Sequence, residues 1–505
     1  MYSILKNSRE NKRLAAILIF ILALIFSTTT AFAHADLLRS QPANGETLKQ
    51  SPKTIDLTFK KELQVVSMNS IAVTDQNGKR VDKNSVVISE DGKQMRSELQ
   101  ELSFGTYTVQ WKTLSADDHT IKGAFTFKVA LSNNAASIAA PEQPTSNDKM
   151  RRDHQMPMQE SGTNLGQSAA RWLVYLAMMT LFGGFAFRLL VLKPSLEQAR
   201  DLSDEERAFG FGQAENRFVR LTWLSLALLA VAALASLILQ TSAVLDVSFA
   251  QAFAPSRLFQ VLTETSYGSP WILQIAVMLA LVGIVFFIAR GRKDLSAKTP
   301  LLWIGLGLSA LLFLTPSLTG HARAAVKEYQ FAVFSDWLHL VAVGSWVGGL
   351  FHLALMMPKS IAHFGGSRRL CVLSRVIPLF SRLAIGSSIL IALTGIYNSW
   401  IHVDSFSALW NTTYGQVLSM KIILFLPMLA LGGLNTFVLR PRAIRFDEEA
   451  ISAGEHQRTD RSFSRSVRVE AAIGIAVLLL AAILAFLPPT RQHEIIMSDA
   501  VNFKK

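Results

Sequence analysis

From residue 168 onward, long apolar segments alternate with short polar ones. Eight of these segments are long enough to cross a hydrocarbon layer of about 30 Å as helices. They cover residues 168–192, 219–246, 270–290, 301–319, 332–357, 377–401, 417–439 and 469–487. The pattern predicts an all-α polytopic membrane domain over residues 167–489.

The first part of the chain shows a different pattern, in which short runs rich in β-branched and aromatic residues alternate with turn signals. The predicted strands are residues 54–59, 70–74, 85–89, 105–112 and 123–129. The turn sequences Asp75-Gln76-Asn77-Gly78 and Glu90-Asp91-Gly92 are typical of hairpins. Several short strands within about 100 residues predict an all-β sandwich over residues 34–131.

The segments that flank this β-rich part predict export. Residues 1–33 have a basic start, an apolar stretch and the small-x-small sequence Ala31-Phe32-Ala33, as in a cleaved signal peptide. Cleavage there makes His34 the new N-terminus, while an uncleaved anchor is the alternative. Residues 132–166 are rich in Asn, Ser, Pro, Gln and charges, which predicts a flexible linker.

The distribution of basic residues sets the orientation. If residue 34 lies outside, the inner loops carry five, four, four and seven Lys or Arg residues, and the outer loops carry one, two and none. This bias follows the positive-inside rule. We expect a multi-pass protein of the plasma membrane, with the β-domain and the tail over 490–505 on the extracellular side. The net charge of +13 then reflects the inner loops rather than nucleic-acid binding.

The cysteine count narrows the candidate chemistry. Cys371 is the single cysteine, so the chain holds neither an internal disulfide nor a Cys-based zinc or iron–sulfur site. A metal site would use His, Met, carboxylates or the N-terminal amine. The sequence has no Gly-x-x-x-x-Gly-Lys-Ser/Thr run, which argues against an ATP-driven pump, and nothing in it predicts an enzyme.

Two features of the β-rich part form a candidate metal site. An N-terminal His34 offers an amine and an imidazole nitrogen, which can chelate one ion. Asp117 and His119 point the same way if their segment is extended. Three nitrogens and one oxygen suit tetragonal Cu(II), whereas zinc favours a tetrahedral arrangement. The nitrogens must lose protons to bind, so affinity should fall at low pH.

The same residues belong to a set that resembles the CopC copper-binding family. The matching motifs are His34-Ala35-x-Leu37, Ser40-x-Pro42-Ala43-x-Gly45, Leu57-Thr58-Phe59, Gly105-Thr106-Tyr107-x-Val109-x-Trp111, Ser115-x-Asp117-x-His119 and Gly123. The resemblance implies a cupredoxin-like, Greek-key β-domain that binds Cu(II) through His34, Asp117 and His119. The family usually has Gly at the position of Asp118, so both Asp117 and Asp118 are candidate ligands, and position favours Asp117.

Polar residues inside the predicted membrane segments suggest a second site. Asp336 and His339 are neighbours on one face of the fifth segment, and His321 follows the fourth. Together they form a candidate entrance for a cation from the outside. Gly348 and Gly349 would allow close helix packing. Asn435 and Glu470 are candidate hydrogen-bonding partners between helices.

The membrane segments resemble the CopD family of copper-transport proteins. The matching pieces are Gly320-His321-Ala322, Asp336-x-x-His339, Trp346-x-Gly348-Gly349, Leu393-Thr394-Gly395-x-Tyr397-Asn398, Thr413-Tyr414-Gly415-x-x-x-x-x-Lys421 and Arg465-Ser466-Val467-Arg468-x-Glu470. A chain with a CopC-like and a CopD-like part resembles the fused, YcnJ-type copper importers. That resemblance implies copper uptake, with Cu(II) in the exported domain, Cu(I) in the membrane domain and an extracellular copper chaperone as partner.

Three hypotheses follow for the function. Copper import is the first. Copper resistance by sequestration or export uses the same ligands and is the second. A membrane oxidoreductase with haem or copper is the third, but it needs paired inward-facing histidines. His321 lies at a helix end and His352 near the inner side, which argues against such a pair.

Overall fold

The computed structural model describes residues 37–60, 62–116, 118, 120–130, 165–198, 203–290, 295–320, 329–355, 366–439 and 453–490. The predicted signal peptide, nearly all of the predicted linker and the predicted tail lie outside these residues. The chain divides into two compact units. One contains the β-domain together with Ile238–Ser269, and the other contains Leu165–Leu237 and the chain from Pro270 onward.

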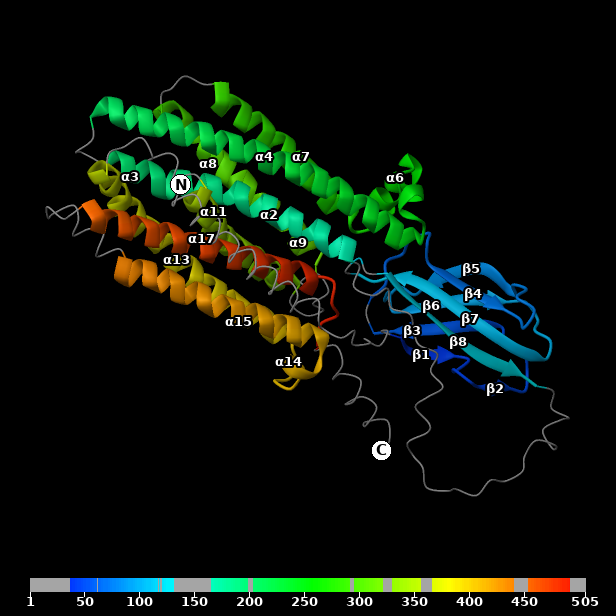
Figure 1. The fold of residues 1–505 in the computed structure, drawn as a ribbon. Coiled ribbons are helices and arrows are strands. Elements are labelled where there is room, and N and C mark those ends of the chain that lie inside the picture. Colours follow the sequence, from blue (N-terminus) through cyan, green and yellow to red (C-terminus); the bar gives the residue numbers. More distant parts are fainter. Residues whose placement is uncertain are drawn as a thin grey trace, which may run out of the picture. The chain divides into compact units, whose positions relative to one another are not determined.

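The β-domain is a sandwich of two four-stranded sheets, as predicted (Figure 1). The order is β1-β3-β6-β5 in one sheet and β2-β8-β7-β4 in the other. The strands are β1 (Leu37–Gln41), β2 (Thr47–Leu48), β3 (Thr54–Phe59), β4 (Ser70–Thr74), β5 (Asp82–Ile88), β6 (Gln94–Leu99), β7 (Gly105–Leu114) and β8 (Thr120–Val129). The five predicted strands are present, and β1, β2 and β6 are additional.

Alternation along the strands builds the core of this sandwich. In β3, Ile55, Leu57 and Phe59 are buried, while the residues between them are partly exposed. The ring of Phe59 meets that of Trp111 of β7 edge-on, with centroids 5.0 Å apart. A Cβ on Gly123 of β8 would lie 2.7 Å from the Trp111 ring, so only glycine fits beside the tryptophan. The two sheets therefore share one tightly packed interior.

The rest of the described chain is helical, and eight stretches are long and apolar enough to cross a membrane, as predicted. The elements are α2 (Leu165–Phe187), η1 (Arg188–Leu192), α3 (Lys193–Glu197), α4 (Asp204–Leu245), α5 (Phe249–Ala252), α6 (Pro255–Glu264), α7 (Gly268–Arg290), α8 (Leu295–Leu312), α9 (Leu314–Leu318), α10 (Tyr329–Val343), η3 (Gly344–Gly348), α11 (Gly349–Leu355), α13 (Gly366–His402), α14 (Ala408–Asn411), α15 (Thr413–Leu434), η4 (Asn435–Leu439) and α17 (Ala453–Leu484). Large apolar side chains such as Ile396 and Phe437 stay exposed, as expected of a surface that faces lipid.

Helix α2 is the most buried of the eight spans and packs closely on η3. A Cβ on Gly348 would lie 2.0 Å from the Met179 carbonyl oxygen, and one on Gly183 would lie 2.1 Å from the Gly348 backbone. A Cβ on Gly349 would lie 2.7 Å from the ring of Phe380. The predicted close packing at Gly348 and Gly349 is confirmed, because small residues let helix backbones approach each other in a membrane.

Replacing Gly348 with alanine should disrupt the helical unit. The added methyl group would collide with a backbone carbonyl, which cannot move aside as a flexible side chain can. Overpacking costs about 1–3 kcal/mol even where side chains adapt, so we expect a larger loss here. Size-exclusion chromatography after detergent extraction should show a strong loss of monodisperse protein. The control is Gly307→Ala, where a Cβ meets nothing within 4 Å, and an equal profile for the two variants would contradict this packing.

Candidate metal sites

The predicted site residues fall into two groups. His34, Asp117, His119 and His321 lie outside the described residues, whereas Asp118, Asp336 and His339 lie within them. Among the described residues, no group of three or more His, Cys, Asp or Glu side chains could hold a metal ion. We call the Asp117-Asp118-His119 sequence the DDH motif, and the structure describes its middle residue and the residues around it. It also describes Asp336 and His339, which we call the membrane pair.

The DDH motif connects β7 to β8 through a short segment with a fixed start. The backbone N–H of Ala116 donates to the Glu62 carbonyl at 3.0 Å, and Ser115 forms an isolated antiparallel β-bridge with Leu63. The N–H of Asp118 donates to the Ser115 carbonyl at 3.0 Å. Asp118 itself has a φ of 64°, in the left-handed region that glycine adopts without strain. Asp118 is therefore not extended, so the expectation that an extended segment makes Asp117 and His119 point the same way is not met at this residue.

The carboxylate of Asp118 is engaged by protein donors and is 8% exposed. Its Oδ1 accepts from Gln64 Nε2 at 2.8 Å and from Ser266 Oγ at 2.6 Å. The Asp118 carbonyl accepts from Gln240 Nε2 at 2.9 Å. A carboxylate held in this way already has a structural role at this position.

The membrane pair lies on α10, and neighbouring helices hold its two side chains. Asp336 Oδ2 accepts from Ser317 Oγ of α9 at 2.6 Å. His339 is 8% exposed, and its Nδ1 lies 2.9 Å from Thr394 Oγ1 of α13. The Thr394 hydroxyl donates its proton to the Leu390 carbonyl at 2.6 Å, so it accepts from the histidine. In the neutral ring the lone pair is then on His339 Nε2, the nitrogen that can bind a metal.

Two basic side chains act on the Asp336 carboxylate. Lys421 of α15 and Arg171 of α2 both interact electrostatically with Asp336. Lys421 also acts on His339. Lys421 therefore acts electrostatically on both polar residues of α10.

A second buried carboxylate lies in the helical bundle. Glu470 of α17 is 2% exposed and accepts from Trp346 Nε1 at 2.9 Å and from Asn435 Nδ2 at 3.2 Å. The predicted hydrogen bond between Asn435 and Glu470 is confirmed. Because Trp346 belongs to η3 and Asn435 to η4, this carboxylate ties three elements together.

Substitutions at Glu470 test whether this residue stabilises the fold as a hydrogen-bond acceptor rather than through its charge. In Glu470→Leu the Trp346 and Asn435 donors lose their acceptor, which costs about 1–3 kcal/mol for each buried group. In Glu470→Gln the Asn435 amide can turn to accept from the new amide, so the network survives. We expect the leucine variant to lose its folded state several degrees earlier on heating in detergent, and the glutamine variant to match the parent. Equal melting of both variants would contradict this role.

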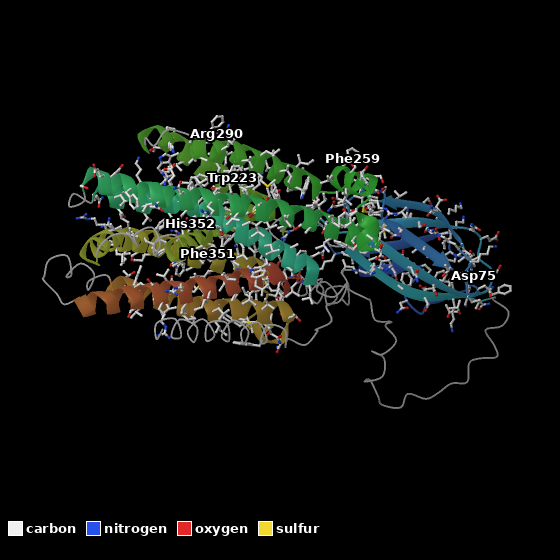
Figure 2. The ribbon with its side chains drawn as sticks, turned by 45° about the horizontal axis from the view of Figure 1, so that its top comes forward. Asp75, Trp223, Phe259, Arg290, Phe351 and His352 are labelled. Atoms are coloured by element: carbon white, nitrogen blue, oxygen red, sulfur yellow. The ribbon has the colours of Figure 1, made fainter. Side chains whose placement is uncertain are left out.

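The Glu215 ion-pair cluster was missed in the sequence, and the surroundings of His352 were not predicted from it. Glu215 of α4 accepts from Arg188 Nη2 at 3.1 Å and from Lys298 Nζ at 2.5 Å, which joins three membrane helices. The signal was available, because Arg188 interrupts an apolar segment. His352 of α11 lies inside the helical unit (Figure 2). Its Nε2 lies 3.0 Å from the Thr180 carbonyl, which commits that ring nitrogen to the backbone.

Comparisons with known proteins identify relatives for both parts of the chain. Residues 374–484 match the family described as Copper resistance protein D, and residues 158–329 match its N-terminal domain. Copper resistance protein D of Pseudomonas syringae pv. tomato is 31% identical over 324 residues, which are 64% of this chain and 96% of that protein. The chain belongs to the copper resistance protein D family. Residues 37–130 match the CopC domain, so CopC and CopD domains are fused in one chain.

Two further relatives are similar to the fused CopC–CopD chain. The Copper transport protein CutJ of Bacillus subtilis is 28% identical over 478 residues, which are 93% of this chain and 77% of that protein. Copper resistance protein C of Xanthomonas campestris pv. juglandis is 32% identical over 123 residues, covering 23% of this chain and 96% of that protein. The chain is thus a multi-pass membrane protein of a copper transport and resistance family.

Proposed function

We propose that this CopC–CopD chain takes up copper across the plasma membrane, with its β-domain on the extracellular side. The similarity over 93% of the chain to a protein named for copper transport supports transport over binding alone. The distribution of basic residues supports the orientation. In this account copper and lipid are the immediate partners, and an extracellular copper chaperone supplies the metal.

The exported domain captures Cu(II) through His34, Asp117 and His119. The contacts of Asp118 support Asp117 as the carboxylate ligand, because Gln64 and Ser266 already occupy Asp118 Oδ1. Asp118 itself adopts a left-handed backbone between these two positions of the sequence. Amine and imidazole ligands with one carboxylate suit Cu(II).

The observation that carries the membrane step is the buried pair on α10. His339 is fixed by Thr394 so that Nε2 is the metal-binding nitrogen, and Asp336 lies one helical turn away. His321 precedes them on the path from outside. Lys421 balances the Asp336 charge while the site is empty, and an arriving copper ion replaces it as the partner of the carboxylate.

Beyond this pair, thioethers favour Cu(I). Met178 and Met179 of α2 and Met428 of α15 are buried in the bundle core, where they also fill space. Sulfur ligands select Cu(I) over harder cations. In this account an electron donor outside this chain, such as a thiol, reduces the captured Cu(II) by one electron, and copper passes the membrane domain as Cu(I), the state suited to a reducing cytoplasm.

Growth of a strain that lacks the gene tests the direction of transport. Import predicts poor growth under a copper chelator and normal growth in excess copper, with rescue by the parent gene. The reverse pattern would replace import with resistance by sequestration or export. A Soret band in the absorbance spectrum of the purified protein would favour the oxidoreductase hypothesis instead.

A further inference from the structure

The connection between the second and third membrane spans belongs to the same compact unit as the β-domain. This segment, Ile238–Ser269, contains the last two turns of α4 together with α5 and α6, and it ends in the first turn of α7. Its apolar side chains Val244 and Val261 pack against Val66 and Leu114 of the β-domain. All four are at most 9% exposed, so this contact excludes water. By contrast, Phe259 of α6 is 68% exposed (Figure 2).

A set of hydrogen bonds surrounds this apolar contact. Gln64 and Ser266 bond each other twice, since Ser266 N donates to Gln64 Oε1 at 2.8 Å and Gln64 Nε2 donates to Ser266 Oγ at 2.9 Å. Ser67 Oγ donates to Glu264 Oε2 at 2.5 Å and accepts from Gln260 Nε2 at 3.0 Å. Reciprocal bonds of this kind fix orientation as well as proximity.

The same connection reaches the DDH motif from two sides. Ser266 Oγ donates to the Asp118 carboxylate at 2.6 Å, and Gln240 Nε2 donates to the Asp118 carbonyl at 2.9 Å. On the other side of His119, Thr120 Oγ1 donates to the Ala243 carbonyl at 3.3 Å. The backbone between the predicted ligands is therefore held by residues from outside the sandwich.

Charges support the same contact. Lys122 Nζ of β8 lies 3.8 Å from Asp246 Oδ1, at the end of α4. Burial lowers the pKa of Lys112 on the neighbouring strand, and the Asp246 carboxylate opposes part of that shift.

We propose that the connection between the second and third membrane spans is a dock that preorganises the copper site of the exported domain. Gln240 and Ser266 are its positioning residues, and they act through Asp118. The inference rests on the proposed function, since it takes Asp117 and His119 as copper ligands. A residue other than glycine is strained in the left-handed region, and the hydrogen bonds of the dock stabilise Asp118 in that conformation. Ligands fixed before the metal arrives bind it more tightly.

Two substitutions remove the contact by different means. Ser266→Ala deletes the hydroxyl that donates to the Asp118 carboxylate. Asp118→Gly deletes the carboxylate and leaves a residue that adopts the left-handed conformation freely. In the purified full-length protein we expect each to weaken Cu(II) binding by about 10-fold, the effect of one hydrogen bond to a charged group. The double variant should be no weaker than the worse single variant, because Asp118→Gly already removes the acceptor of the Ser266 hydroxyl.

The copper spectrum separates positioning from general damage. Electron paramagnetic resonance of the Cu(II)-loaded variants should show a changed or mixed coordination signal, and Ser266→Thr, which keeps the hydroxyl, should restore the parent signal. The matched control is Thr263→Ala on α6, whose exposed hydroxyl bonds only to carbonyls of its own helix. The Thr263→Ala variant should bind Cu(II) with the parent affinity and give the parent resonance signal.

His119→Ala distinguishes failure of the dock from failure of the copper site. If His119→Ala leaves Cu(II) affinity unchanged, the proposed copper site is wrong and the dock has nothing to position. If His119→Ala abolishes binding, while Ser266→Ala and Asp118→Gly keep the parent affinity and signal, the copper site stands and the dock is overturned. Folding of each variant is checked by size-exclusion chromatography. If Ser266→Ala does not fold, Asp118→Gly alone tests the contact.

Discussion

Replacing His34 with alanine should weaken Cu(II) binding by the purified protein by more than about 100-fold. Loss of an outer-shell partner alone costs roughly 10–100-fold in metal affinity, and in the proposed site His34 contributes a directly bound imidazole nitrogen. The alanine keeps the amine but cannot close the chelate ring. The measurement is chelator competition with the full-length protein, after mass spectrometry has confirmed cleavage behind Ala33.

His154→Ala provides the control for this variant, because it removes an imidazole from the predicted linker and leaves the proposed ligands intact. It should bind Cu(II) like the parent. An affinity of His34→Ala equal to that of the parent would exclude the N-terminal chelate and leave Asp117 and His119 as an ordinary surface pair.

Replacing His339 with alanine should reduce copper uptake by at least about 10-fold and leave Cu(II) binding by the exported domain unchanged. In the proposed path the substitution removes a copper ligand of the membrane pair and leaves the proposed site of the β-domain intact. Thr394→Val should show a smaller loss of about 10-fold or less, because it removes only the acceptor that orients the ring. Uptake is measured as initial rates in copper-starved cells at matched protein levels.

Ser388→Ala is the matched control for Thr394→Val. Its hydroxyl lies on the same helix, α13, and donates to the Ala384 carbonyl at 2.7 Å within that helix. Parent-like uptake is expected there. If His339→Ala also transports like the parent, the pair on α10 is not on the copper path, and Glu470 becomes the buried carboxylate to test next.

Most of the membrane architecture could be predicted from the sequence because lipid imposes a simple rule. A span must be apolar over a length set by the bilayer, and the eight spans obey it. The polar exceptions were harder to interpret. Arg188 lies inside a span, but its partners Glu215 and Lys298 come from other helices, and no local pattern connects them.

The β-domain shows the same limit at shorter range. Strand β6 was missed because Gln94, Arg96 and Glu98 occupy its outward positions and lower its apparent β-propensity. Its inward residues Met95 and Leu99 reveal it only beside β3. Strand β2 has two residues, too few for any periodicity.

The dock could not be predicted from the sequence either. Ser266 and Asp118 are separated by 148 positions, and each alone reads as an ordinary polar loop residue. What the sequence does contain is the departure from glycine at Asp118 within a motif that resembles CopC. The structure assigns that carboxylate a contact, which explains why a residue with a side chain occupies a left-handed position.

The central claim, copper import, is tested most directly by radiocopper accumulation in copper-starved cells with and without this protein. Import predicts higher accumulation with the protein, and a return to the background level when His339 is replaced with alanine. Equal or lower accumulation with the protein would contradict import and would favour sequestration, export or redox chemistry.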